Sequence, residues 1–130
     1  MPGCHVQPEQ MFNLIFGYND RYSETGSDLG PAAGPYDAVL GDVDPNEVWV
    51  INTIWGLNNT RGCVIRLRFK MGADDHIVAA ITTTAAGQTA TWNGAVVMEE
   101  GDFVHVTFVN SLLNDDLYWG ALGYKMVLTQ

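Results

Sequence analysis

Positive charge is scarce in this sequence of 130 residues. Six Lys and Arg residues stand against 15 Asp and Glu residues, which gives a formal net charge of −9. Proteins that bind nucleic acid gather cations on a phosphate-binding surface, and anionic membranes attract the same kind of basic patch. A chain with this excess of acidic residues lacks the cations for either kind of binding. We therefore predict no nucleic-acid partner and no membrane partner.

Long apolar runs and cysteines are also scarce. No run approaches the roughly 20 residues that span a bilayer, and the N-terminus lacks the basic and apolar regions of a secretory signal. The two cysteines, Cys4 and Cys63, are too few for a disulfide scaffold. Cys63 begins an apolar run, so we expect a buried thiol; a disulfide with Cys4 is the alternative.

Motifs for catalysis and for metal binding are missing. There is no Gly-x-Ser-x-Gly, no phosphate-binding glycine motif, and no metal-ligand spacing around His5, His76 or His105. The acidic pairs at 74–75 and 115–116 lack the pattern of an EF-hand loop, and solvated loop tips explain them more simply. We therefore predict a protein that is not an enzyme and has no catalytic residues, no cofactor and no metal.

What the sequence does contain, from residue 36 onward, is short β-prone runs separated by turn residues. Residues 64–70 alternate apolar and basic side chains, a period of two that fits a strand and not a helix. Asn93-Gly94 is typical of a two-residue hairpin turn. The runs predict an all-β fold, an antiparallel β-sandwich of jelly-roll type, with strands at 36–41, 47–56, 62–71, 76–84, 88–92, 94–98, 102–110 and 116–128.

The first third of the chain has a different character. An apolar run at 11–18 is followed by a segment, 19–35, that is dense in Gly and Pro. We predict that residues 1–34 form an N-terminal extended arm and a Gly/Pro-rich loop, and that residues 35–130 form the jelly-roll domain. The arm is expected to bind a partner or a neighbouring copy through Phe12, Leu14, Ile15, Phe16, Tyr18 and Tyr22.

One predicted strand, 47–55, is apolar on both faces: alternation places Val48, Val50 and Ile54 on one side, and Trp49, Ile51 and Trp55 on the other. A strand in a solvated sheet is polar on one side, so the arm or another subunit should cover the second face. The basic row opposite the apolar residues of 64–70 fits either a solvated face or an acidic surface on a partner. Closed symmetry is common among oligomers, and we expect a homotrimer with subunit-interface residues Trp49, Ile51, Trp55, Arg66 and Arg68.

The C-terminal half resembles a known family. Residues 87–106 (GQTATWNGAVVMEEGDFVHV), 117–126 (LYWGALGYKM) and 47–50 (EVWV) resemble jelly-roll proteins of tailed bacteriophage virions. The likeness covers about residues 45–127, and its Gly-Asp turn into a strand is shared with trimeric jelly rolls of the C1q and tumour-necrosis-factor type. The family supplies no catalytic residues to carry over to this sequence.

The resemblance implies a virion structural role, most often that of a trimeric capsid decoration (cement) protein. Such a protein binds the major capsid protein and stabilises the phage head, so its place is the capsid surface of the virion and, during assembly, the host cytoplasm. The alternative is a carbohydrate- or receptor-binding jelly-roll module of a phage tail or fibre. Exposed aromatic side chains can stack on sugars, whereas buried ones serve a core or an interface; the residues in question are Trp49, Trp55, Trp92 and Trp119.

Overall fold

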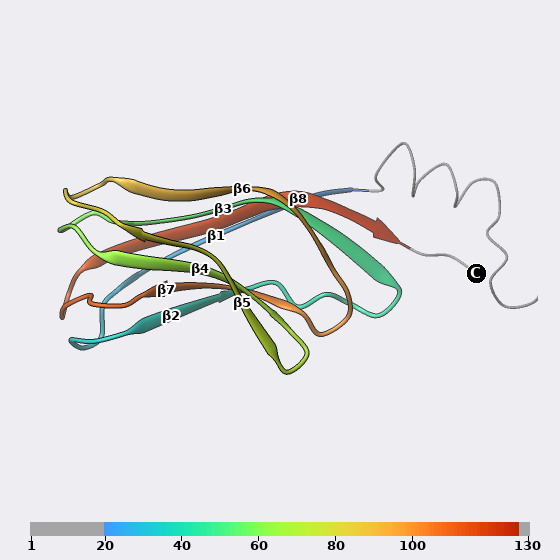
Figure 1. Ribbon diagram of the computed structural model, residues 1–130, viewed down its shortest axis with the longest axis horizontal. Coiled ribbons are helices and arrows are strands. Elements are labelled where there is room, and N and C mark those ends of the chain that lie inside the picture. Colours follow the sequence, from blue (N-terminus) through green and yellow to red (C-terminus); the bar gives the residue numbers. More distant parts are fainter. Residues whose placement is uncertain (1–19, 128–130) are drawn as a thin grey trace, which may run out of the picture.

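The computed structural model describes residues 20–127, which form two packed layers of β-strands (Figure 1). No helix in this range is long and apolar enough to cross a membrane. The strands are β1 (Asp20–Leu29), β2 (Tyr36–Leu40), β3 (Glu47–Asn58), β4 (Val64–Met71), β5 (Asp74–Thr82), β6 (Thr89–Met98), β7 (Phe103–Phe108) and β8 (Asp116–Val127).

The strands form two antiparallel sheets of four. Sheet A has the order β1-β8-β3-β6, and sheet B has the order β2-β7-β4-β5. Only β4 and β5 follow one another within a sheet; every other connection crosses from one sheet to the other. This order is that of an eight-stranded jelly roll. The predicted all-β antiparallel sandwich is confirmed.

Residues 20–29, which the sequence placed in the arm and loop, form strand β1 at the edge of sheet A. The strand pairs with β8 along its whole length, from Asp20 opposite Lys125 to Leu29 opposite Asp116. Backbone hydrogen bonds to β8 supply this pairing, so a segment rich in Ser, Gly and acidic residues gives little sequence signal for it. The rest of the predicted arm, residues 1–19, lies outside the described residues, and there the arm stays a prediction.

The hairpin expected at Asn93-Gly94 is wrong, because β6 runs through both residues. A two-residue hairpin turn of that kind needs positive φ at both positions, and neither residue has it. Instead, both halves of β6 pair with β3, across an irregularity between Ile51 and Thr53. The Thr53 hydroxyl donates to Oδ1 of Asn93 over 2.9 Å, which fastens the two strands at that point.

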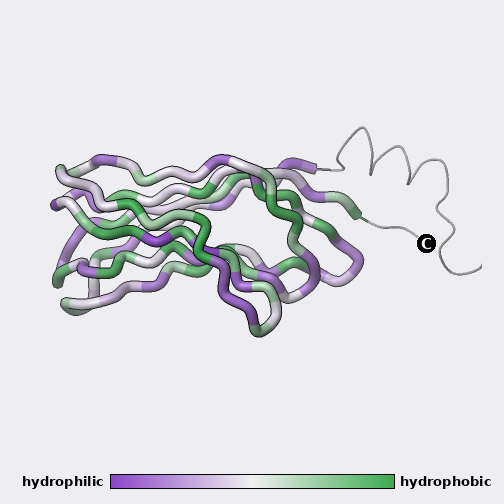
Figure 2. Tube along the Cα trace, in the orientation of Figure 1, coloured by the Kyte–Doolittle hydropathy of each residue, from purple (hydrophilic) through white to green (hydrophobic). Residues whose placement is uncertain are grey.

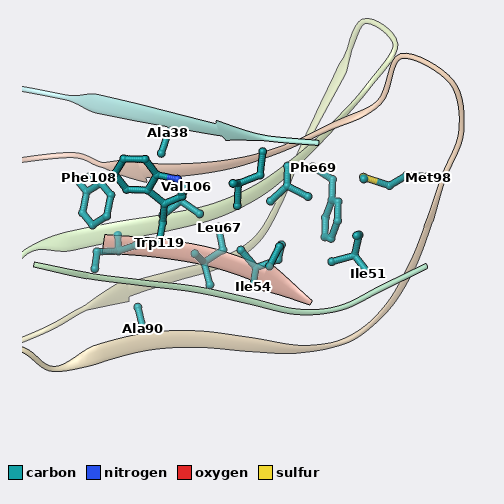
Figure 3. Close-up of a cluster of buried hydrophobic side chains, with 14 of the residues drawn as sticks. Ala38, Ile51, Ile54, Leu67, Phe69, Ala90, Met98, Val106, Phe108 and Trp119 are labelled. Atoms are coloured by element: carbon teal, nitrogen blue, oxygen red, sulfur yellow. The ribbon is translucent and has the colours of Figure 1, made fainter. Parts of the chain in front are cut away.

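The core lies between the sheets and is built from the inward side chains of both. Figure 3 shows Ile51 and Ile54 of sheet A facing Leu67 and Phe69 of sheet B. All four are fully buried, and burying a side chain of this size contributes about 1.5–3 kcal/mol relative to leaving it exposed. The period of two predicted for 64–70 is confirmed, since Ile65, Leu67 and Phe69 point inward.

A buried carboxylate fixes the loops at one end of the sandwich. Asp115 is completely buried and accepts hydrogen bonds from Nδ2 of Asn58, Nε of Arg61 and the amide of Leu112, each over 2.8 Å. Burial alone would raise the pKa of Asp115, but these hydrogen bonds outweigh burial and lower it. The charged carboxylate therefore stabilises the folded state.

Replacing this carboxylate by an amide, Asp115→Asn, should lower the free energy of unfolding by on the order of 2 kcal/mol at pH 7, because buried donors lose a charged acceptor. The folded-state pKa lies below the ordinary value of 3.8. The stability that the charged Asp115 contributes is therefore fully present above pH 3.8, and it is lost as the pH falls from there through the lowered pKa of the folded state. Urea unfolding at pH 7 and at pH 3 measures both effects.

The matched control is Asp74→Asn, at an exposed position at the start of β5, which should leave the stability at pH 7 unchanged. If the free energies of unfolding of Asp115→Asn and of the unchanged protein differ by the same amount at pH 7 and at pH 3, the charge of this carboxylate does not stabilise the fold.

Candidate interaction surfaces

A β-bulge in β3 decides which of its apolar side chains face the core. The pairing of β3 with both neighbours shifts by one residue between Ile51 and Thr53. Before the shift Trp49 and Ile51 point inward, with exposed fractions of 5% and 0%; after it Ile54 points inward. Trp55 therefore faces outward. The prediction that Trp55 lies on the same face as Trp49 and Ile51 is wrong.

The outward side chains of strands β3, β6 and β8 form a largely apolar surface, which we call the A face. The strand registers align Trp55 with Gly120 of β8 and Thr91 of β6, and they align Thr53 with Leu122 and Asn93. Residues in register on antiparallel strands share a face. The A face comprises Val50, Thr53, Trp55 and Leu57 of β3, Tyr118, Gly120, Leu122 and Tyr124 of β8, and Thr91, Asn93 and Val97 of β6.

Several of these side chains are open to solvent in the described part of the chain. The exposed fraction is 56% for Val97, 43% for Leu122 and 36% for Tyr118. The Trp55 ring lies flat across β8, since a Cβ on Gly120 would come within 2.5 Å of the indole. Only a glycine allows the ring to lie so close, and the indole thus extends the apolar surface over two strands.

Acidic side chains avoid the A face. The acids of β1 take the opposite side of their strand: Glu24 accepts hydrogen bonds from the Tyr22 hydroxyl and the Gly41 amide, and Asp28 accepts one from Tyr36. Among outward positions of sheet A within residues 20–127, Asp116 is the one acid, at the first position of β8. Figure 2 shows hydrophilic residues gathered in the loops at the end of the sandwich that carries residues 41–46 and 99–102.

The outward side of sheet B has a different chemistry, centred on Arg68. Its guanidinium donates to Asp37 over 3.2 Å and to Thr107 over 2.9 Å, and it also pairs with Asp75. Nδ1 of His105 lies 2.9 Å from the second Asp37 oxygen. Burial alone would raise the pKa of Asp37, but the hydrogen bonds from His105 and Thr107 contribute to lowering it. This network is polar and sets two carboxylates, Asp37 and Asp75, against the single charge of Arg68.

The predicted site residues do not form one surface. Tyr22, assigned to the arm, is 4% exposed and packs its ring 4.6 Å from that of Trp49, so both belong to the core with Ile51. Trp55 lies on the A face, whereas Arg66 and Arg68 lie outward on sheet B. The remaining arm residues, Phe12, Leu14, Ile15, Phe16 and Tyr18, lie outside the described residues.

Leu122, Tyr118 and Val97 are surface residues that the sequence interpretation missed. As a strand, the run 117–124 would be apolar on both of its faces. The same pattern drew attention to 47–55. Applied to this second run, the two-sided pattern would have found the β8 part of the A face.

The remaining candidates for a functional site are metal ligands, the Cys63 thiol and the tryptophans. Residues 20–127 contain no group of three or more His, Cys, Asp or Glu side chains placed to hold a metal ion. Cys63 is buried and free, and burial raises the pKa of its thiol against the opposing hydrogen bond to Asn110. Of the four tryptophans, Trp49, Trp92 and Trp119 pack on the core, which leaves Trp55 on an outer face.

No family model matches the chain, and no curated protein matches it. Similar solved structures include a protein of the Bacillus endospore appendages, a family of disulfide-linked pili, at 13% identity and a TM-score of 0.44, covering 84% of this chain and 89% of that one. The Drosophila NLP core, described for pentamer formation and histone binding, matches at 18% identity and a TM-score of 0.40, covering 83% and 99%.

A chain of infectious bursal disease virus, Gx strain, is similar at 11% identity and a TM-score of 0.46. The likeness covers 98% of this chain and 36% of that one. Scores below 0.5 describe a loose overlap of chain paths. Nothing about the partners or the function of this protein follows from them.

Proposed function

We propose that the protein is a non-enzymatic virion structural protein, a capsid decoration (cement) protein that forms homotrimers, binds the major capsid protein and stabilises a phage head. The proposal places it on the capsid surface of the virion, after a period in the host cytoplasm during assembly. One observation carries it: the A face is apolar and nearly free of acids in a chain of net charge −9. The resemblance of residues 45–127 to phage jelly rolls supplies the rest.

The A face suits contact between identical acidic copies. Each copy carries a large negative charge, so contact through acid-bearing surfaces is opposed by repulsion. The A face avoids this cost and buries Leu122, Val97 and Trp55, which water solvates poorly. Large exposed apolar patches on soluble proteins mark interaction sites, and here a second copy is the partner that the charge distribution favours.

The size of the A face suits a small contact. A strand spacing of about 4.8 Å and a rise of about 3.3 Å per residue give three strands, each about eight residues long, an area of roughly 400 Å². Two copies would bury roughly 800 Å² in total, which is in the range of weak interfaces and below the roughly 1,200–2,000 Å² of stable ones. In a closed trimer each copy turns this face toward the common axis and shares it with two neighbours.

Light scattering coupled to size exclusion should give three times the chain mass of 14.2 kDa at micromolar concentration. Leu122→Asp should reduce this mass to that of the monomer, because an unpaired carboxylate buried in an apolar contact costs several kcal/mol. Ile77→Asp is the matched control, since Ile77 is 55% exposed but lies on sheet B; it should remain trimeric.

Circular dichroism of both variants confirms that they fold. A monomeric unchanged protein, or equal masses for Leu122→Asp and Ile77→Asp, would refute the A face as the trimer contact.

Binding to the capsid is the second part of the proposal. In co-sedimentation with shells of the phage that encodes the chain, the full-length protein should pellet with the shells. The paired change Phe12→Ser and Phe16→Ser should weaken binding by about tenfold, because the arm loses two large apolar contacts. The control pair Gln7→Ser and Gln10→Ser, in the same segment, should bind normally.

If the full-length chain does not pellet with shells but binds glycans on an array, the decoration function is wrong and the carbohydrate-binding alternative replaces it. If the two Phe changes bind shells as tightly as the unchanged chain, the arm is not the anchor.

A further inference from the structure

Half of the positive charge of the chain lies on the outward side of one strand, β4. The three cations are Arg66, Arg68 and Lys70. They alternate along the strand with Ile65, Leu67 and Phe69, which point inward and are buried. Arg68 is neutralised by Asp37 and Asp75. Arg66 and Lys70 are exposed and form no ion pair or hydrogen bond with any residue between 20 and 127. Two cations are thus unpaired in a strongly acidic protein, although Asp75 lies opposite Lys70 on the neighbouring strand β5.

A small pocket lies beside Lys70. Val39 and Phe103 give it apolar walls, and His105 contributes a polar wall. Nδ1 of His105 is engaged by Asp37, while its Nε2 is buried without a partner in the described part of the chain. The volume of about 190 Å³ is below the roughly 300–1,000 Å³ of sites for drug-sized ligands. The pocket therefore suits a single apolar side chain.

The positions of the two cations define the spacing of a ligand. Arg66 and Lys70 are four residues apart on one strand, which corresponds to about 13 Å at 3.3 Å per residue. Two carboxylates four residues apart on an extended peptide have the same separation. The pocket is also lined by Lys70, Gly72 and Gly101, so it lies at the Lys70 end of this pair. The residue two positions beyond the carboxylate on Lys70 faces the same way as that carboxylate and is the one placed toward the pocket. A polyanion such as nucleic acid fits poorly, because phosphate binding needs a continuous basic surface and the carboxylates of Asp37 and Asp75 interrupt this one at Arg68. Two separate carboxylates avoid that position.

We propose that the outward side of sheet B binds an extended acidic segment of a second protein, with carboxylates on Arg66 and Lys70 and an apolar side chain in the pocket lined by Val39, Phe103 and His105. The A face and this surface lie on opposite sides of the sandwich (Figure 1). Copies packed on the A face leave sheet B open to a different partner, and the inference takes only this point from the proposed function.

The test uses the full-length chain and a fluorescent nine-residue peptide of serine and threonine, with two glutamates four residues apart and a phenylalanine two positions beyond one of them. Fluorescence polarisation at low salt should show binding that weakens as salt is added, since screening reduces exposed charge interactions. Arg66→Glu and Lys70→Glu should each weaken binding by about tenfold. Arg21→Glu, on β1 of sheet A, makes the same change in net charge and should alter binding by less than about twofold.

Two altered peptides test the ligand without changing the protein: glutamine in place of both glutamates, and serine in place of phenylalanine. Both should bind at least about tenfold more weakly. No binding of the original peptide, equal binding of the altered peptides, or an equal loss in Arg21→Glu would overturn the inference.

The mass of the variants separates this inference from the proposed function. If Arg66→Glu and Lys70→Glu lower the oligomer mass, sheet B contacts another copy and the assignment to a second protein is overturned. If the unchanged chain is monomeric and the peptide binds with the predicted dependence, the inference stands and the trimer is refuted.

Discussion

A two-layer sandwich can bury only one face of each sheet, and this limit governs the rest of the structure. Strands β3 and β8 carry apolar side chains on both faces, so the core takes Ile51, Ile54 and Trp119 while Trp55 and Leu122 remain outside. The apolar surface left over is larger than scattered single side chains, and within residues 20–127 its members Val97, Leu122 and Tyr118 stay exposed to solvent. Contact with another molecule is the remaining way to remove it from water.

The distribution of charge follows the same division. Acids occupy loops, the inward side of β1 and the network around Arg68, and they leave the centre of the A face neutral. The outward side of sheet B keeps two free cations instead. One face of the molecule is thus compatible with an identical acidic copy and the other with an acidic partner, which gives the two sheets different roles in one assembly.

The sequence was informative where apolar and polar side chains alternated regularly along a strand. Alternation in 64–70 gave both the inward face and the basic row of β4, and the two-sided apolar run around Trp55 indicated a covered surface. It misled where local geometry broke the period. The bulge between Ile51 and Thr53 moved Trp49 and Trp55 to opposite faces, and pairing with β3 kept Asn93-Gly94 extended. Strand β1 was missed because its hydrogen bonds come from β8, whose paired residues lie between 87 (Leu29 to Asp116) and 105 (Asp20 to Lys125) positions further along the chain.

The central claim, that the A face meets another copy, is tested most directly by hydroxyl-radical footprinting of the unchanged protein over a range of concentrations. The account predicts that Trp55, Tyr118 and Leu122 lose reactivity as concentration rises, in step with the formation of the oligomer, while Ile77 on sheet B stays reactive. Constant reactivity of the A-face residues across the transition from monomer to oligomer would contradict it.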